Sequence, residues 1–151
     1  EFLGTATPEG PRFVYPLELS LATAMVAPRV ALIGDAAHGV HPVAGQGLNM
    51  GLKDVAALTE VLADARLLGE DIGAEPVLDR YAQWRRFDTV ALTPAFDAFV
   101  RLFSNDIAPV RAVRDLGMAA VNRIAPLRRA FMHEAGGATG DLPRLLRGEP
   151  V

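Results

Sequence analysis

The chain has 151 residues, of which half are apolar and 22% are charged, a composition typical of a globular domain with its own core. The net charge of −3 gives no reason to expect binding to nucleic acid, and the absence of cysteine excludes disulfide bonds and thiolate chemistry. No apolar run reaches the about 20 residues that span a bilayer, and we expect a cytoplasmic protein.

Two segments near the N-terminus are predicted to be strands. Residues 12–21 (RFVYPLELSL) alternate in part, and Pro16 limits them to an edge or a bulged strand. Residues 29–35 (RVALIGD) form a continuous apolar run, which is typical of a strand buried on both faces of a parallel sheet. One such strand cannot pair its backbone groups alone, so we expect the remainder of the sheet to lie outside this chain.

Helices are predicted for most of the remaining chain. The first has apolar residues at steps of three and four and should end at Leu68, with Gly69 as a left-handed cap. Its apolar stripe consists of Leu48, Leu52, Val55, Leu58, Leu62 and Ala65. The second should begin at Pro76, and Pro94 should kink or divide it. Its apolar side consists of Val77, Tyr81, Trp84, Leu92, Phe96, Phe99 and Phe103.

Two shorter helices are predicted to follow. Asp106 is the expected N-cap of the third, and the fourth should run from Pro126 to the pair Gly136 and Gly137. The residues after 138 are expected to be extended or irregular. The predicted fold is therefore an α+β chain, mostly α-helical, with two or three short N-terminal strands.

Asp35 follows the apolar run of residues 29–34, at the end of a strand, where open α/β sheets place ligands. Its carboxylate could accept hydrogen bonds from sugar hydroxyls, or it could cap a turn by bonding to backbone N–H groups, and the residues alone favour neither. His38 and His41 have the spacing of a weak metal pair. We expect loop histidines bonded to the backbone and no metal site.

Residues 45–51 (GQGLNMG) resemble a dinucleotide fingerprint, but they lie too far beyond the strand to bind a pyrophosphate in its first turn. Gly45 and Gly47 would instead let the backbone approach a flat ligand closely. The N–H groups of Gly47, Leu48 and Asn49 would then face a ligand that gains negative charge. The alternative is that Gln46 or Asn49 simply caps the helix.

The segment GDAAHGVHPVAGQGLNMGLKD (residues 34–54) resembles the second flavin-binding motif of class A flavin monooxygenases. Within it, HPVAGQGLNMGLKD is similar to the pattern of the ubiquinone-biosynthesis hydroxylases. All of its fixed positions are present: His41, Pro42, Ala44, Gly45, Gln46, Gly47, Asn49, Gly51 and Asp54. RFVYPLELSLA, YAQWRRFD, RLFSND and GDLPRLLRG also resemble segments of this family.

The resemblance implies that the chain is the C-terminal part of a Rossmann-like FAD-binding monooxygenase fold. Residues 1–28 would end the substrate-domain sheet, residues 29–70 would contact the flavin, and residues 71–151 would form a helical region and tail. Asp35 would bind the ribityl hydroxyls of FAD, and Pro42 would lie beside the isoalloxazine ring. The pyrimidine side of the ring would be lined by Gly45, Gln46, Gly47, Leu48 and Asn49. No residue of the chain is expected to be catalytic.

The resemblance also implies a reaction, in which NAD(P)H reduces FAD and O2 then supplies a hydroxyl group to a polyprenylated phenol of ubiquinone biosynthesis. The chain alone is expected to be inactive and to self-associate through its uncovered apolar face. Arginines after residue 100 could form a docking surface for a biosynthetic complex or for the inner membrane. The alternative is a solvated basic face packed on the domain.

Overall fold

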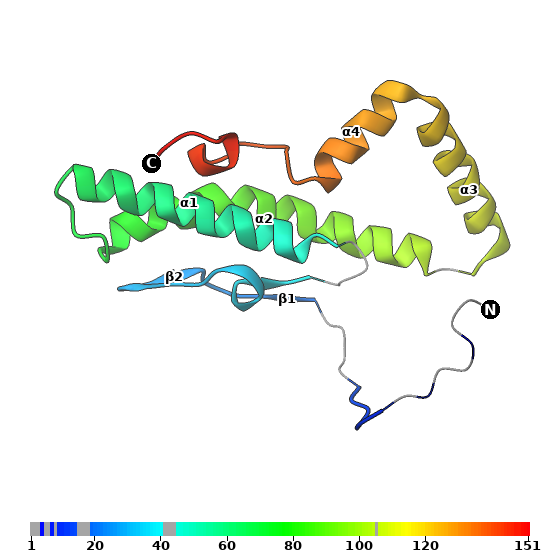
Figure 1. The fold of residues 1–151 in the computed structure, drawn as a ribbon, viewed down its shortest axis with the longest axis horizontal. Helices are drawn as coiled ribbons and strands as arrows, with labels where there is room; N and C mark the ends of the chain where they lie inside the picture. The colour runs from blue at the N-terminus through cyan, green and yellow to red at the C-terminus, as the bar shows by residue number, and fades with distance from the viewer. Residues whose placement is uncertain (1–3, 5–6, 8, 15–18, 41–44, 105) are drawn as a thin grey trace.

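A computed structural model describes the chain except for residues 1–3, 5–6, 8, 15–18, 41–44 and 105, and it describes residues 91–97 and 99 in their backbone alone. Two long helices, α1 (Gly47–Leu67) and α2 (Glu75–Phe103), lie side by side and form the body of the molecule (Figure 1). Short strands lie along one side of this pair: β1 (Ser20–Leu21), β2 (Val26–Ala27), β3 (Val30–Ala31) and β4 (His38–Gly39). The prediction of a mostly helical chain with a few short N-terminal strands is confirmed.

The strands pair in two antiparallel ribbons. β1 pairs with β4, with Ser20 opposite Gly39, and β2 pairs with β3 across a turn at Pro28 and Arg29. Arg29 has a φ of 61°, which is unfavourable for a residue with a side chain. Its N–H donates to the carbonyl of Gly73 at 3.1 Å, and its guanidinium pairs with Asp71 at 2.8 Å. These two bonds hold the turn in place and join it to the loop between α1 and α2.

The prediction of a doubly buried parallel strand over residues 29–35 is wrong for this chain. Only Val30 and Ala31 are in a strand, their neighbour β2 is antiparallel, and Val30 is 51% exposed. A two-residue turn returns the chain directly, whereas a parallel neighbour needs a crossover of about a dozen residues. In the predicted strand over residues 12–21, residues 12–14 are irregular and only Ser20 and Leu21 pair, while Tyr15 and Pro16 lie outside the described residues.

The apolar core lies between α1 and α2. Ala57 and Ala65 of α1 are fully buried, and their small side chains let α2 approach closely enough for Tyr81 to be fully buried as well. The Tyr81 hydroxyl donates to the carbonyl of Leu32 at 2.8 Å, and burial raises the pKa of Tyr81, so the hydroxyl keeps its proton. Leu58, Leu62 and Trp84 pack against this core.

The apolar stripe predicted for α1 is only partly the buried face. Leu48, Leu52 and Val55 are exposed, whereas the buried side of the same turns is formed by Met50, Lys53, Asp54, Ala56 and Ala57. Hydrophobic spacing could not predict this rotation, because the buried face carries two charged side chains that are paired inside the protein.

The helix ends follow the sequence signals with two exceptions. α1 ends at Leu67, one residue before the predicted Leu68, and Gly69 has a φ of +72°, as expected for a left-handed cap, while Pro76 lies in the first turn of α2. Of the two outcomes expected at Pro94, a kink or a division of the helix, the division is wrong, because α2 continues through this residue to Phe103. Asp106 is not the cap of α3 (Ala108–Arg123), since the chain enters this helix through Ile107 and the proline that follows.

The end of the chain is more ordered than predicted. α4 (Ala125–Ala135) ends at Gly136, and Gly137 has a φ of +69°, as expected for a glycine stop. In the tail, a short 3-10 helix, η3 (Arg144–Arg147), replaces the predicted irregular segment. Arg144 pairs with Glu60 at 2.9 Å and with Asp64 at 2.5 Å, and these ion pairs fix the tail on α1.

α3 and α4 form an arm, which we define as residues 108–135. α3 turns away from the end of α2, and α4 returns toward the start of α1 (Figure 1). Neither helix contains a buried residue. Among the described residues, no helix combines the length and the apolar character needed to cross a membrane.

Candidate functional site

The start of α1 carries backbone donors without partners. Gln46, the N-cap residue of α1, makes no side-chain cap hydrogen bond. The first helical bond runs from the N–H of Met50 to the carbonyl of Gln46 at 2.9 Å. Among the described residues, none accepts a hydrogen bond from the N–H groups of Gly47, Leu48 or Asn49. Positive partial charge therefore collects at this end of a helix of 21 residues.

The turn η1 (Gly34–Ala36) lies directly beside this helix start. A Cβ at Gly51 would meet the Cα of Gly34 at 3.5 Å, and Gly34 itself has a φ of +58°, so glycine serves the close approach on both sides. A Cβ at Gly47 would lie 3.8 Å from Oδ1 of Asp35. The structure thus places the carboxylate of Asp35 close to the free amides of α1.

Asp35 is exposed, and no hydrogen bond joins its carboxylate to another of the described residues. The alternative in which Asp35 caps a turn is therefore not supported. Gly45, with a φ of +62°, has nothing within 4 Å of the position of a Cβ, and Leu48 is 73% exposed. Pro42, the remaining predicted contact, lies outside the described residues.

The side chains of Gln46 and Asn49 have a different role from either of the predicted ones. Both amide groups donate to the carbonyl of Ala135 at the end of α4, Gln46 at 3.1 Å and Asn49 at 2.9 Å. Asn49 also donates to Gln46 Oε1 at 3.0 Å. Gln46 is the N-cap residue of α1, as the alternative expected, but neither side chain makes a cap hydrogen bond, and the backbone N–H of Asn49 stays available.

A buried charged cluster lies behind the turn. Asp54 and His38 are fully buried and Arg85 is 2% exposed. Asp54 Oδ2 accepts from the N–H of Gly34 at 2.8 Å and lies 2.6 Å from His38 Nε2. Asp54 Oδ1 accepts from Arg85 Nε at 2.7 Å. One carboxylate on α1 therefore joins the turn η1, strand β4 and helix α2.

Two further residues extend the cluster. Arg85 Nη1 donates to Asp88 at 2.6 Å, and Lys53 Nζ lies 3.7 Å from the same carboxylate. Lys53 also donates to the carbonyl of Thr139 at 2.9 Å, which connects the segment after α4 to the cluster. Burial alone would raise the pKa of Asp54, but the hydrogen bonds from His38, Arg85 and Gly34 outweigh it and hold this pKa below its ordinary value of 3.8.

The prediction for His38 is wrong in its partner, because the imidazole pairs with the Asp54 carboxylate and not with the backbone. His41 lies outside the described residues. The sequence patterns identify Asp54 only as a position of the motif, and they do not identify Arg85. The signal that could have revealed the pair is a carboxylate in the second turn of a helix together with the doubled arginine of the segment YAQWRRFD.

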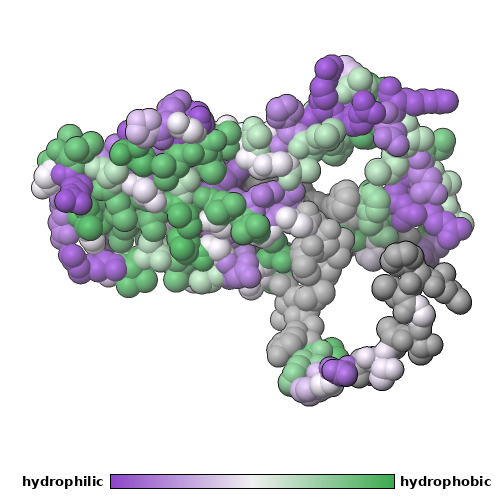
Figure 2. All heavy atoms as spheres, viewed as in Figure 1, coloured by the Kyte–Doolittle hydropathy of each residue, from purple (hydrophilic) through white to green (hydrophobic). Residues whose placement is uncertain are grey.

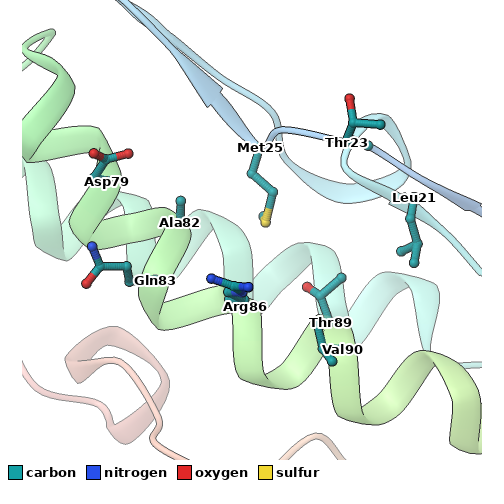
Figure 3. A pocket seen from close by; sticks show the side chains of 10 residues that line it. Leu21, Thr23, Met25, Asp79, Ala82, Gln83, Arg86, Thr89 and Val90 are labelled. Carbon is teal, nitrogen blue, oxygen red and sulfur yellow. The ribbon is translucent and has the colours of Figure 1, made fainter.

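A separate open groove of about 550 Å³ runs between α2 and the connection from β1 to β2 (Figure 3). Met25 lines it from the connection, and Gln83, Arg86 and Thr89 line it from α2 (Figure 3). None of the described residues that are predicted to contact the flavin lines this groove. It is therefore distinct from the start of α1.

Comparison with known proteins assigns the family. A model described as an FAD binding domain matches residues 12–92, which is more than half of the chain and includes the turn η1, α1 and the charged cluster. The chain belongs to the FAD binding domain family. The segments that resemble a flavin motif thus lie in a matched FAD-binding region, and FAD is the cofactor.

Several curated proteins are similar to this FAD binding domain protein. Ubiquinone hydroxylase UbiL of Rhodospirillum rubrum is 52% identical over 154 residues, which take in all of this chain and 36% of the relative. The 3-demethoxyubiquinol 3-hydroxylase of Escherichia coli is 43% identical over 82% of this chain and 32% of its own length. Ubiquinone biosynthesis monooxygenase COQ6 of Homo sapiens is 43% identical over 80% of this chain and 26% of its own length.

The chain thus spans about a third or less of the length of these relatives. No solved structure is significantly similar to it. The residues present fit FAD: Asp35 offers a carboxylate without a partner among the described residues, and α1 offers free amides beside it. Gly45 leaves open space where a ring could approach.

Proposed function

We propose that this chain is the flavin-ring-binding part of an FAD-dependent monooxygenase that hydroxylates a polyprenylated phenol of ubiquinone biosynthesis, with NAD(P)H and O2 as co-substrates. The observation that carries the proposal is the placement of the Asp35 carboxylate beside the three uncapped N–H groups of α1. The printed functions of the relatives support the substrate class. When bound, FAD would supply the redox chemistry and the activation of O2.

The residues of this chain would bind and polarise the cofactor and would not act as acid, base or nucleophile. Asp35 would accept hydrogen bonds from the ribityl hydroxyls. The N–H groups of Gly47, Leu48 and Asn49 would face the pyrimidine edge of the ring and stabilise its charge after reduction. A helix N-terminus contributes about 0.3–1 kcal/mol, and up to about 2 kcal/mol when partly buried. This would raise the reduction potential moderately, by about 30 mV for each 1.4 kcal/mol.

The cofactor assignment is tested on the complete gene product that contains these 151 residues. We expect it to purify with FAD or to take up FAD stoichiometrically. Asp35→Ala should raise the dissociation constant for FAD roughly 10- to 150-fold, which corresponds to the loss of about 1.5–3 kcal/mol of charged hydrogen bonding. The matched control is Asp106→Ala, which removes an exposed carboxylate from the chain before α3. A protein that binds no FAD would overturn the proposal.

The reaction has a test of its own. The FAD-loaded protein should oxidise NADPH or NADH and consume O2 in the presence of a short-chain polyprenylphenol, and the product should gain one oxygen atom. Oxidation of NAD(P)H without any hydroxylated product, over a range of phenols, would contradict the substrate class but not the binding of FAD.

We also propose that the α3–α4 arm binds a membrane of anionic lipid. The arm contains five arginines and only Asp115 and Glu134 as acids. Figure 2 shows polar and apolar side chains interleaved on the arm. Neither α3 nor α4 contains a buried residue. Arg114 is partly engaged, because it pairs with Asp115 and stacks on Phe103. The large exposed apolar side chains of the arm are Val113, Leu116, Met118, Ile124, Leu127, Phe131 and Met132.

Arginine beside large apolar side chains is the composition of helices that lie in a membrane surface. The alternative of a basic face packed on the domain is less well supported, since neither helix is buried on any side. Under the function proposed above, the prenylated substrate would lie in the same membrane, so docking of the arm would bring the enzyme to its substrate.

Vesicle flotation of the complete gene product tests this docking. We expect binding to vesicles that contain phosphatidylglycerol and little binding to phosphatidylcholine alone. Arg128→Gln with Arg129→Gln should weaken binding about 30-fold, at about 1 kcal/mol for each arginine. Arg12→Gln with Arg66→Gln makes the same change of charge elsewhere and should have little effect. Equal binding to both kinds of vesicle, or none to the anionic ones, would contradict the proposal.

We further infer that the 151 residues expressed alone are inactive and self-associate. Val30, Phe87 and Val90 are each more than half exposed on the body. Apolar surface of this kind is normally covered. Sedimentation should show a dimer or a larger species, and a clean monomer would count against this inference.

A further inference from the structure

The buried charged cluster of Asp54, His38 and Arg85 contains none of the residues proposed to contact the flavin, so the proposed function leaves it unexplained. His38 of β4 and Arg85 of α2 both bond to the carboxylate of Asp54 on α1. His38 Nδ1 and Arg85 Nη2 are buried without a hydrogen-bond partner among the described residues. The cluster is thus incompletely satisfied, which makes it costly to bury.

Stability alone is a poor reason for such a cluster. Desolvation of a buried ion pair cancels much of its attraction, and apolar replacements of similar volume are often as stable. Such groups are better explained where they specify one geometry. The cluster is therefore expected to fix the conformation of a nearby segment, which an apolar core would not fix.

That segment is the turn η1. Asp54 Oδ2 accepts the N–H of Gly34 at 2.8 Å, and Gly34 is the residue directly before Asp35. Gly34 lies in the left-handed region and packs closely on Gly51, one turn of α1 before Asp54. Movement of the Asp54 carboxylate would therefore move the turn, and with it the carboxylate of Asp35.

We propose that Asp54 is a positioning residue, which acts through the N–H of Gly34 to hold Asp35 beside the free amides of α1, while His38 and Arg85 fix the carboxylate of Asp54. The inference rests on the proposed function, since Asp35 is taken to bind FAD. It assigns roles to three residues that do not touch the cofactor themselves.

The test compares Asp54→Asn with Asp88→Asn in the complete gene product. Both changes remove a carboxylate that pairs with Arg85, but only Asp54 contacts the turn. At a temperature where both variants remain folded by circular dichroism, Asp54→Asn should raise the dissociation constant for FAD about tenfold or more. Asp88→Asn should change it less than twofold. The visible circular dichroism spectrum of the bound flavin should also change in Asp54→Asn and should stay unchanged in Asp88→Asn.

A readout without cofactor separates this inference from the proposed function. Hydrogen exchange of the Gly34 amide in the FAD-free protein should be faster in Asp54→Asn than in Asp88→Asn or the wild type. If the wild type binds no FAD, the proposed function fails, while the exchange result still decides whether Asp54 holds the turn. Unchanged exchange at Gly34, or equal loss of FAD affinity in both variants, would overturn the inference.

If Asp54→Asn does not fold, His38→Gln replaces it. This change removes one partner of Asp54 Oδ2 and leaves the bond to Gly34 in place. It should raise the dissociation constant severalfold and accelerate exchange at Gly34 to a smaller degree. A folded His38→Gln variant with wild-type values of both quantities would refute the positioning role.

Discussion

The α1–α2 body and the α3–α4 arm are both built from amphipathic helices, but they are stabilised differently. In the body, small side chains such as Ala57 and Ala65 allow close packing, and a buried carboxylate joins three elements. In the arm, neither helix buries a residue. Similar local signals thus give a helix pair with a buried core in one region, while the helices of the arm keep their apolar side chains exposed or half-buried.

The arm is joined to the body by hydrogen bonds at the start of α1. Gln46 and Asn49, at the start of α1, donate to the carbonyl of Ala135 at the end of α4. The arm is therefore attached to the helix start that is proposed to face FAD, although it packs on little else. The same two residues belong to the segment that resembles a flavin motif, so their side chains bond to the arm while their backbone is proposed to line the cofactor site.

The largest effect is expected from Arg85→Met in the body. This change leaves the fully buried Asp54 without its guanidinium partner, so the free energy of unfolding should fall by about 3–5 kcal/mol. Urea unfolding of the chain followed by circular dichroism measures it. Adding Asp54→Leu should recover a large part of the loss, because no unpaired charge then remains. A loss below about 1 kcal/mol in the single variant would show that the pair contributes little.

A smaller effect is expected from pH. The pKa of Asp54 is lower in the folded chain than its ordinary value of 3.8, so the carboxylate stabilises the fold above that value. This stability should be lost as the pH falls through the lowered pKa. The urea midpoint should therefore drop between neutral pH and about pH 3, and it should drop less in Asp54→Asn. Equal acid sensitivity in both proteins would assign the effect to other carboxylates.

Much of the helical structure could be predicted because its signals are local. Gly69, Pro76, Pro126 and Gly137 mark helix ends through backbone conformations that depend on one or two residues. The proximity of Asp35 to the helix start could also be anticipated, since both lie in one motif of 21 residues. These predictions needed no knowledge of distant contacts.

The rest depends on contacts between distant segments. Arg85 lies 31 residues after Asp54, and Ala135 lies 86 residues after Asn49, and no spacing rule brings these pairs together. The apolar run of residues 29–34 predicted a doubly buried strand, and this prediction is wrong for this chain, where Val30 and Ile33 are exposed. Hydrophobic spacing does not predict which face of α1 is buried, because that face carries Lys53 and Asp54, which are charged and yet buried.

The smallest effect is expected in the arm, and one substitution made in both regions measures the contrast. Leu116 of α3 is 71% exposed and Leu78 of α2 is 4% exposed, and both lie in helices. Leu78→Ala should lower the free energy of unfolding by about 2–5 kcal/mol, because it leaves a cavity in the body. Leu116→Ala should change it by less than about 0.5 kcal/mol, since alanine is also a good helix former and no cavity results.

In flotation with anionic vesicles the order of the two effects should reverse. Leu116→Ala should weaken binding, and Leu78→Ala, while folded, should leave it unchanged. If Leu116→Ala cost as much stability as Leu78→Ala, α3 would be packed against the protein in solution, and the arm would have no free apolar face for a membrane.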